Sequence, residues 1–143
     1  MIENYITDVC KLLKIQIPFI SYDTSHFTTK TMMAQCSSDG STIYLNKIDR
    51  LNPDYMFAIA HELRHVWQIQ TNQVLYFSDY KPIELCSSIE EYNLQLAEVD
   101  ANAFAAIIMI DLVHLQPQWN GLSSSVVTAI ENRINTVIHS LEQ

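Results

Sequence analysis

The sequence predicts an α+β fold in which a small antiparallel sheet is followed by helices. Two observations support this prediction. Between residues 15 and 46, short runs of good strand formers alternate with turn residues, whereas from residue 52 onward the apolar residues recur at helical spacing. The chain has 143 residues, 48% of them hydrophobic, and it contains no internal repeat or linker-like segment. We therefore expect a single domain spanning residues 1–143.

The first elements expected are a helix over residues 2–13, whose apolar residues recur at helical spacing, and a strand over residues 15–22. Pro18 favours an edge position for this strand, because proline has no amide hydrogen to donate to a neighbour. Residues 28–36 and 42–46 predict a hairpin, and Asp39-Gly40 between them is typical of a tight turn.

The helical part of the chain begins at Asn52, which can accept hydrogen bonds from the free amides of the first turn. This helix is expected to end near Thr71 and to be followed by an irregular stretch. Ser87 and Glu90 have capping-box spacing and predict the start of a long helix through residue 108. The last helix is expected over residues 123–141, after breaks at a proline and a glycine.

The charge balance excludes some partners. The sequence has 8 basic and 16 acidic residues, giving a formal charge of −8. A negative protein releases no counterions from nucleic acid or from an anionic membrane face, so neither is an expected partner. The longest apolar stretch, residues 103–110, is far below the roughly 20 residues that would span a bilayer.

The sequence has three widely spaced cysteines and no Cys-x-x-Cys pair. This pattern argues against a disulfide framework and is typical of proteins in a reducing compartment. The charged amino-terminal segment does not have the pattern of a secretion signal. We therefore expect a cytoplasmic location. Cys36 and Cys86 are conceivable zinc ligands, but neither has a partner at short spacing.

The segment His61-Glu62-Leu63-Arg64-His65 carries the clearest chemical signal. Residues four apart lie on the same face of a helix, so both imidazoles can point at one cation. Zinc prefers nitrogen donors, and a catalytic zinc keeps one position open for water. Glu62 would lie beside that water and act as its general base.

A catalytic zinc site needs a third protein ligand. Gln68 and Thr71 stand where the extended metzincin pattern has Gly and His, which excludes that class. The expected third ligand is Glu98, on the face of a later helix that carries small residues, and Asp100 is the alternative. Asn102 lies one turn after Glu98. It is expected to accept a hydrogen bond from His61 or His65, at the ring nitrogen that does not bind the metal.

The pentapeptide, together with E-x-D-A-N-A-F-A about thirty residues later, resembles the ImmA/IrrE family of zincin-like metallopeptidases. The similarity covers residues 42–110, and Glu98 matches the metal-ligand position of the wider gluzincin group. The chain departs from the family pattern where Arg64 replaces the usual Gly and Asp100 replaces Glu. It also has no helix-turn-helix segment, so the resemblance gives no support for DNA-linked regulation.

The resemblance implies a minimal zincin-like domain that hydrolyses a protein or peptide substrate with Zn²⁺ as cofactor. Such enzymes need a donor for the oxyanion. The candidates are Tyr76, Tyr80, Tyr92 and His114. The strand over residues 42–46 is expected to be the edge strand that holds an extended substrate. A zinc-binding module that regulates or binds without turnover is the alternative function, and the oligomeric state stays open.

Overall fold

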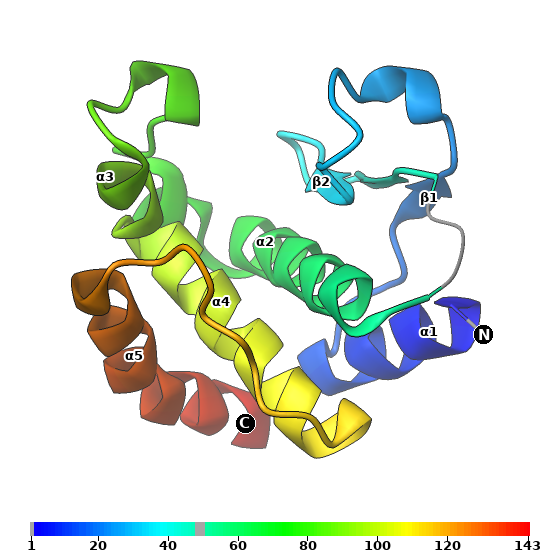
Figure 1. Ribbon diagram of the computed structural model, residues 1–143. Coiled ribbons are helices and arrows are strands. Elements are labelled where there is room, and N and C mark those ends of the chain that lie inside the picture. The colour runs from blue at the N-terminus through cyan, green and yellow to red at the C-terminus, as the bar shows by residue number, and fades with distance from the viewer. Residues whose placement is uncertain (1, 48–50) are drawn as a thin grey trace.

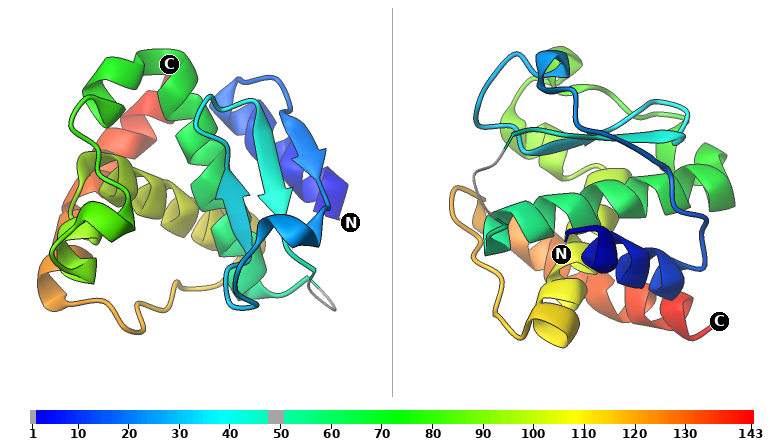
Figure 2. Two further views of the ribbon diagram at one scale, coloured as in Figure 1. Left: turned by 90° about the horizontal axis from the view of Figure 1, so that it is seen from above. Right: turned by 90° about the vertical axis from the view of Figure 1, so that its right-hand side faces the viewer.

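The computed structural model describes residues 2–47 and 51–143, and it is a mixed α+β structure (Figure 1). The strands form one small sheet, which lies against one side of the long helix α2, while α4 and α5 lie on its other side (Figures 1 and 2). The elements are α1 (Ile2–Leu13), β1 (Phe19–Ser21), β2 (Ala34–Cys36), β3 (Thr42–Leu45), α2 (Pro53–Phe77), α3 (Ile89–Asn93), α4 (Leu96–Ile108) and α5 (Ser124–Glu142). Two 3₁₀ turns (Thr24–His26 and Ile83–Leu85) and a π-helical turn (Met109–Val113) complete them.

The sheet differs from the expected antiparallel one, because its strand order is β1-β3-β2 and β1 runs parallel to β3. β1 lies at an edge, as Pro18 predicted, but it is shorter than the expected strand over residues 15–22. The prediction that residues 42–46 form an edge strand is wrong. β3 lies in the centre of the sheet, since it pairs with both other strands, and β2 forms the second edge.

The expected hairpin is present between β2 and β3, although residues 28–33 are not part of a strand. Its turn is held by Asp39, whose Oδ1 accepts from the amide of Ser41 at 3.0 Å. Gly40 has a φ of +75°, which favours glycine. A Cβ at this position would also lie 3.3 Å from the side chain of Ile69 on α2, so the turn packs closely on the helix.

The α2 helix starts as predicted, with the side chain of Asn52 accepting from the amide of Tyr55 at 2.9 Å. The regular helix is interrupted at Asn72, next to its predicted end at Thr71. The backbone there is extended, and the Asn72 side chain accepts from the amide of Leu75 at 3.1 Å. Asn72 therefore caps a second short stretch of helix that continues to Phe77.

The long helix predicted from the Ser87–Glu90 pair is instead two helices, and its cap is one residue further along. The side chain of Ser88 accepts from the amide of Glu91 at 3.0 Å, and the Glu91 carboxylate accepts from the amide of Ser87. Between α3 and α4 the chain turns at Gln95, whose side-chain amide exchanges two hydrogen bonds with the backbone of Lys81. These two bonds fix the segment before α3 to the start of α4.

The core is formed largely by α4, which is buried along nearly its whole length. Its alanines allow α2 and α5 to pack closely on either side of it. The predicted last helix is confirmed, with Ser123 as its cap and Val126, Ile130 and Val137 buried. No helix within the described ranges combines the length and the hydropathy needed to cross a bilayer.

Candidate metal centre

Three side chains from two helices converge between α2 and α4. The Nε2 atoms of His61 and His65 lie 3.1 Å apart, as expected for residues one turn apart on α2. Glu98, in the first turn of α4, lies against both: its Oε1 is 3.1 Å from Nε2 of His61 and its Oε2 is 3.1 Å from Nε2 of His65. Each of these three residues offers one possible ligand atom, and these atoms lie within 4.8 Å of one another. They come from the three residues that the sequence singled out.

In each histidine, the ring nitrogen that faces away from the centre lies against a side-chain amide oxygen. Nδ1 of His61 lies 2.7 Å from Oδ1 of Asn102, the contact expected for Asn102 from the sequence. Nδ1 of His65 lies 2.8 Å from Oε1 of Gln68. When Nδ1 carries the hydrogen and donates it to an amide oxygen, the lone pair of Nε2 points toward the other two ligands.

The orientation of Gln68 follows from its other contacts. Its Nε2 lies 3.0 Å from the carbonyl oxygen of Ala97 and 2.8 Å from Oδ2 of Asp100, and both of these atoms only accept hydrogen bonds. The NH₂ group must therefore face them, which leaves Oε1 to accept from His65. Gln68 in this way fixes the His65 tautomer that presents Nε2 to the centre.

Asp100, the alternative third ligand, points away from the histidines into a buried ion-pair network. Its carboxylate accepts from Arg64 Nε at 2.8 Å, from Arg133 Nε at 3.0 Å and from Gln68. The guanidinium of Arg64 also stacks on Trp67, with its central carbon 3.6 Å from the ring centroid. Burial raises the pKa of Asp100, but the hydrogen bonds and charges of the two arginines outweigh it and leave that pKa below its usual value.

Glu62, the expected general base, lies beside the three ligands rather than among them. Its Oε2 is 3.7 Å from Nε2 of His61, and its Oε1 accepts from the backbone amide of Cys36 at 2.8 Å. This amide belongs to β2 and is directed away from β3, so the free edge of β2 runs alongside the site. The thiols of Cys36 and Cys86 are outside the group of possible ligands within the described residues.

The four candidates for the oxyanion donor lie in different places. Tyr80 donates to Oε2 of Glu98 at 2.8 Å, and its hydroxyl is 3.0 Å from that of Tyr92, so these two reach the centre. Because a hydroxyl has one hydrogen and the carboxylate only accepts, the Tyr80 proton goes to Glu98 and Tyr92 donates to Tyr80. Tyr76 instead accepts from Arg133, and His114, in a left-handed turn, makes no hydrogen bond to the centre within the described residues.

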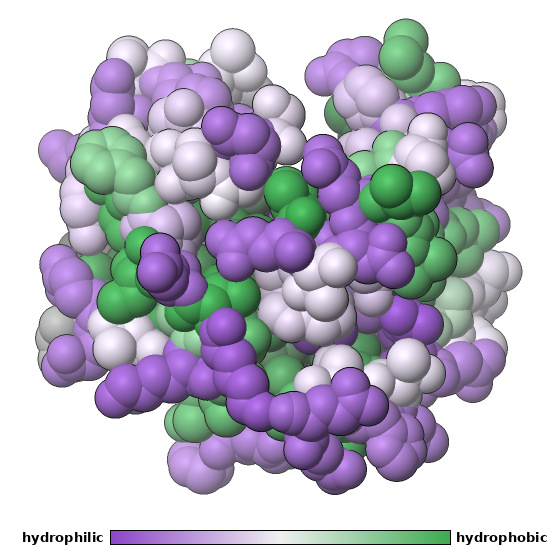
Figure 3. Space-filling model, turned by 180° about the vertical axis from the view of Figure 1, so that it is seen from behind, coloured by the Kyte–Doolittle hydropathy of each residue, from purple (hydrophilic) through white to green (hydrophobic). Residues whose placement is uncertain are grey.

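Two hollows border the centre. The first, of about 560 Å³, is bordered by His61, Glu98 and Asn102 and continues along the connection over residues 115–122; we call it the apolar hollow. The second, of about 530 Å³, is bordered by Glu62, His65 and Tyr80 and continues between β2 and the segment that precedes α3; we call it the polar hollow. The surface is notched between the two lobes that border the polar hollow (Figure 3).

Three contributors to the site are not predicted by the sequence. They are the side chains of Gln68 and Arg133 and the backbone amide of Cys36. In the sequence, Gln68 stands out only as a departure from the metzincin pattern, although it lies one turn after His65 and so shares its face of α2. That spacing is a usable signal. Arg133 and Cys36 are distant from the pentapeptide in sequence, and no local pattern connects them with it.

No family model, no curated protein and no solved structure matches this chain. Its site is therefore interpreted from its own geometry and chemistry.

Replacing Gln68 by methionine should weaken zinc binding about 10- to 100-fold, because His65 loses the partner that fixes its tautomer. Competition with a chromophoric chelator measures the dissociation constant, and the ring ¹⁵N shifts of His65 report the tautomer. The matched control is Gln70→Met, two positions along α2, where the side chain is exposed. Equal zinc affinity in the two variants would contradict the role of Gln68.

Zinc binding should also release protons at neutral pH. Burial lowers the pKa of His65, but its hydrogen bond to Glu98 and the charge of that carboxylate outweigh burial and raise the pKa to about 9. In the metal-free protein the proton on His65 therefore stabilises the fold at low pH, and this stabilisation is lost as the pH rises through about 9. Zinc must displace that proton, so its affinity should increase with pH up to this value.

Calorimetric titrations at pH 7.5 in buffers of different ionisation enthalpy give the number of protons released. The expected value is about one for each zinc ion, and it should fall toward zero above pH 9. A value of zero at pH 7.5 would show that His65 is already neutral in the metal-free protein.

Proposed function

We propose that this protein is a zinc-dependent metallopeptidase of the zincin type, as the resemblance to the ImmA/IrrE family implies. The observation that carries the proposal is the convergence of His61, His65 and Glu98 beside the carboxylate of Glu62, between two open hollows. A site with only a structural role would need neither the adjacent base nor the open sides.

The donor atoms fit zinc. Tetrahedral coordination with bonds of about 2.0–2.1 Å separates neighbouring ligand atoms by about 3.3 Å. Nε2 of His61 and Nε2 of His65 are 3.1 Å apart, and each lies 3.1 Å from one oxygen of Glu98, Oε1 for His61 and Oε2 for His65. Two imidazoles and one carboxylate also form a donor set that zinc prefers over hard cations such as Mg²⁺.

The protein's own groups suit the hydrolysis of a peptide bond. Bound at this position, a zinc ion would supply Lewis acidity that polarises a carbonyl group and acidifies water. Glu62 is placed to take a proton from the attacking water and to deliver it to the leaving amine. Burial and the charge of Glu98 raise the pKa of Tyr80, so its hydroxyl keeps its proton and holds the carboxylate of Glu98 in position.

The edge that faces the site suits a substrate in extended form. β2 has one unpaired edge, and the Cys36 amide on that edge lies within hydrogen-bond distance of Glu62. A peptide added along β2 would therefore pass the general base. This role was expected for residues 42–46, but those residues are paired on both sides in the sheet.

The proposal is tested by measuring metal content and peptide cleavage on the same preparation. Elemental analysis after dialysis should give one zinc per chain, and a Glu98→Gln variant should contain much less, because a neutral amide is a weak zinc ligand. The zinc-loaded protein should cleave members of a mixed peptide library, and a chelator should stop cleavage. Zinc without any cleavage would support the alternative function, a zinc-binding module without turnover.

A further inference from the structure

The apolar hollow contains an aromatic pair with apolar neighbours, and the polar side chains of Asn93, Gln116, Gln118 and Asn120 also border it. Phe57 of α2 and Trp119 of the connection meet edge to face, with ring centroids 5.9 Å apart. The buried side chain of Met109 and the half-exposed side chains of Leu115 and Leu122 complete its apolar wall. The polar hollow, beside Glu62 and His65, presents Gln35, Ser37, Ser38, Gln73 and Glu84, and the apolar side chains of Ile69, Phe77 and Ile83 also border it.

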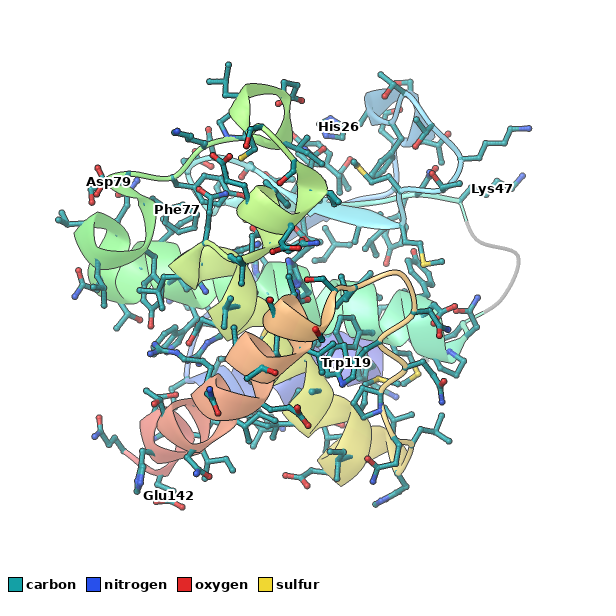
Figure 4. The ribbon with its side chains drawn as sticks, turned by 60° about the vertical axis from the view of Figure 1, so that its left-hand side comes forward. His26, Lys47, Phe77, Asp79, Trp119 and Glu142 are labelled. Atoms are coloured by element: carbon teal, nitrogen blue, oxygen red, sulfur yellow. The ribbon has the colours of Figure 1, made fainter. Side chains whose placement is uncertain are left out.

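The rings of the apolar hollow are held in place by the fold. Phe57 and Trp119 both pack against the hydrophobic core while remaining partly exposed. Trp119 lies on the inner side of the connection, toward α2 (Figure 4). The hollow therefore contains a preformed apolar patch that opens to solvent, a property that marks ligand-binding sites more often than ordinary surface.

The charged residues at the border of the apolar hollow indicate which kind of side chain it can bind. Its border contains no lysine or arginine among the described residues, but it does contain the carboxylates of Asp54, at the start of α2, and Glu98, at the centre. An acidic side chain entering the hollow would lose water and meet the carboxylates of Asp54 and Glu98 without a lysine or arginine to pair with. A large aliphatic or aromatic side chain would bury apolar surface against Phe57 and Trp119.

We propose that the apolar hollow binds a large apolar side chain of the substrate, on a residue next to the bond that is cleaved. This inference rests on the proposed peptidase function, because it takes His61, Glu98 and Asn102 at the border of the hollow as the reacting centre. The hollow of about 560 Å³ lies within the range of small-ligand sites and has room for leucine, phenylalanine or tryptophan. Trp119 and Phe57 are then the residues that determine specificity.

Binding is measured first, without catalysis. Capped peptides of the form acetyl-Gly-X-Gly-amide, with X as glycine, leucine, phenylalanine, aspartate or lysine, are titrated into the metal-free protein. The readouts are the heat of binding by calorimetry, which can be measured for every variant, and in the native protein the indole NMR signal of Trp119. Leucine and phenylalanine peptides should bind at least about 10-fold more tightly than glycine and aspartate peptides. Equal affinity for all five peptides would overturn the proposal.

Two variants and a control locate the preference. Trp119→Ala should reduce the preference for phenylalanine to within about 3-fold of glycine, whereas Phe19→Ala, which removes an exposed ring that borders neither hollow, should leave it intact. Leu115→Glu changes a residue that is 45% exposed, so the variant should fold, and it should shift the preference toward lysine. An unchanged order of affinities in both hollow variants would overturn the proposal.

Cleavage of the same peptides with zinc bound separates this inference from the function on which it depends. Selective binding at Trp119 without cleavage would support the apolar hollow and contradict the peptidase. Cleavage with the same efficiency for every X would support the peptidase and contradict the apolar hollow.

Discussion

Replacing Glu62 by glutamine should lower peptide cleavage by about 10²- to 10⁴-fold, because the variant keeps the shape of the side chain but loses the proton acceptor. The zinc content should stay at the native level, since Glu62 lies beside the three ligand residues and is not one of them. The amide oxygen of the glutamine can still accept from the backbone amide of Cys36. Cleavage kinetics and elemental analysis on the same preparation separate loss of catalysis from loss of metal.

The matched control for this experiment is Glu84→Gln. Glu84 is exposed and borders the same hollow as Glu62, so its replacement makes the same change in charge without touching the centre. Its cleavage rate should stay within about 2-fold of native. If the two variants lost activity equally, the negative charge of the hollow, and not a general base, would be the relevant property.

Replacing Asp100 by asparagine should destabilise the protein by about 3–5 kcal/mol, the second large effect that we expect. The carboxylate is fully buried, and Arg64, which is 1% exposed, depends on it for its charge partner. Without the carboxylate, a buried guanidinium is left uncompensated. Urea denaturation at pH 7 measures the loss, and Glu131→Gln on the exposed face of α5 is the control, with an expected change below about 0.5 kcal/mol.

Removing both charges should be less harmful than removing one. In an Asp100→Leu, Arg64→Met double variant no buried charge is left from this pair, so part of the stability lost in Asp100→Asn should return.

Lowering the pH should also destabilise the protein, as the Asp100→Asn substitution does. The pKa of Asp100 is lowered in the folded protein, so its stabilisation is present above its unfolded pKa of about 3.9 and is lost as the pH falls through the folded value. A constant difference between native and Asp100→Asn proteins down to pH 2 would contradict this assignment.

The parts of the fold that were predicted from the sequence are those set by local patterns. The cap at Asn52 and the turn at Gly40 depend on residues within a few positions of each other, and both were found as expected. The strand order was not predicted correctly. The parallel pairing of β1 with β3 joins segments that are more than twenty residues apart, and no feature of residues 42–46 indicates that both of their edges are covered.

The same distinction holds at the centre. The spacing of His61 and His65 is a local property of a helix. The small residues on the same helix face favour Glu98 over Asp100 as the third ligand. The structure places the two acidic residues accordingly, one beside the histidines and one beside the arginines. The partners of Asp100 could not be predicted, because Arg133 is supplied by α5, thirty-three residues further along the chain.

The ion-pair network of Asp100 connects the last helix with the proposed metal ligand His65. Arg133 and Ser140 of α5 hold Asp100 and Arg64 from one side, and Gln68 holds His65 from the other. A shortened chain ending before residue 124 would thus lack both anchors, although every residue of the pentapeptide would still be present. The candidate metal centre therefore depends on the turns of α5 that carry Arg133 and Ser140, and fragments designed around the histidine helix alone should not be used to judge its chemistry.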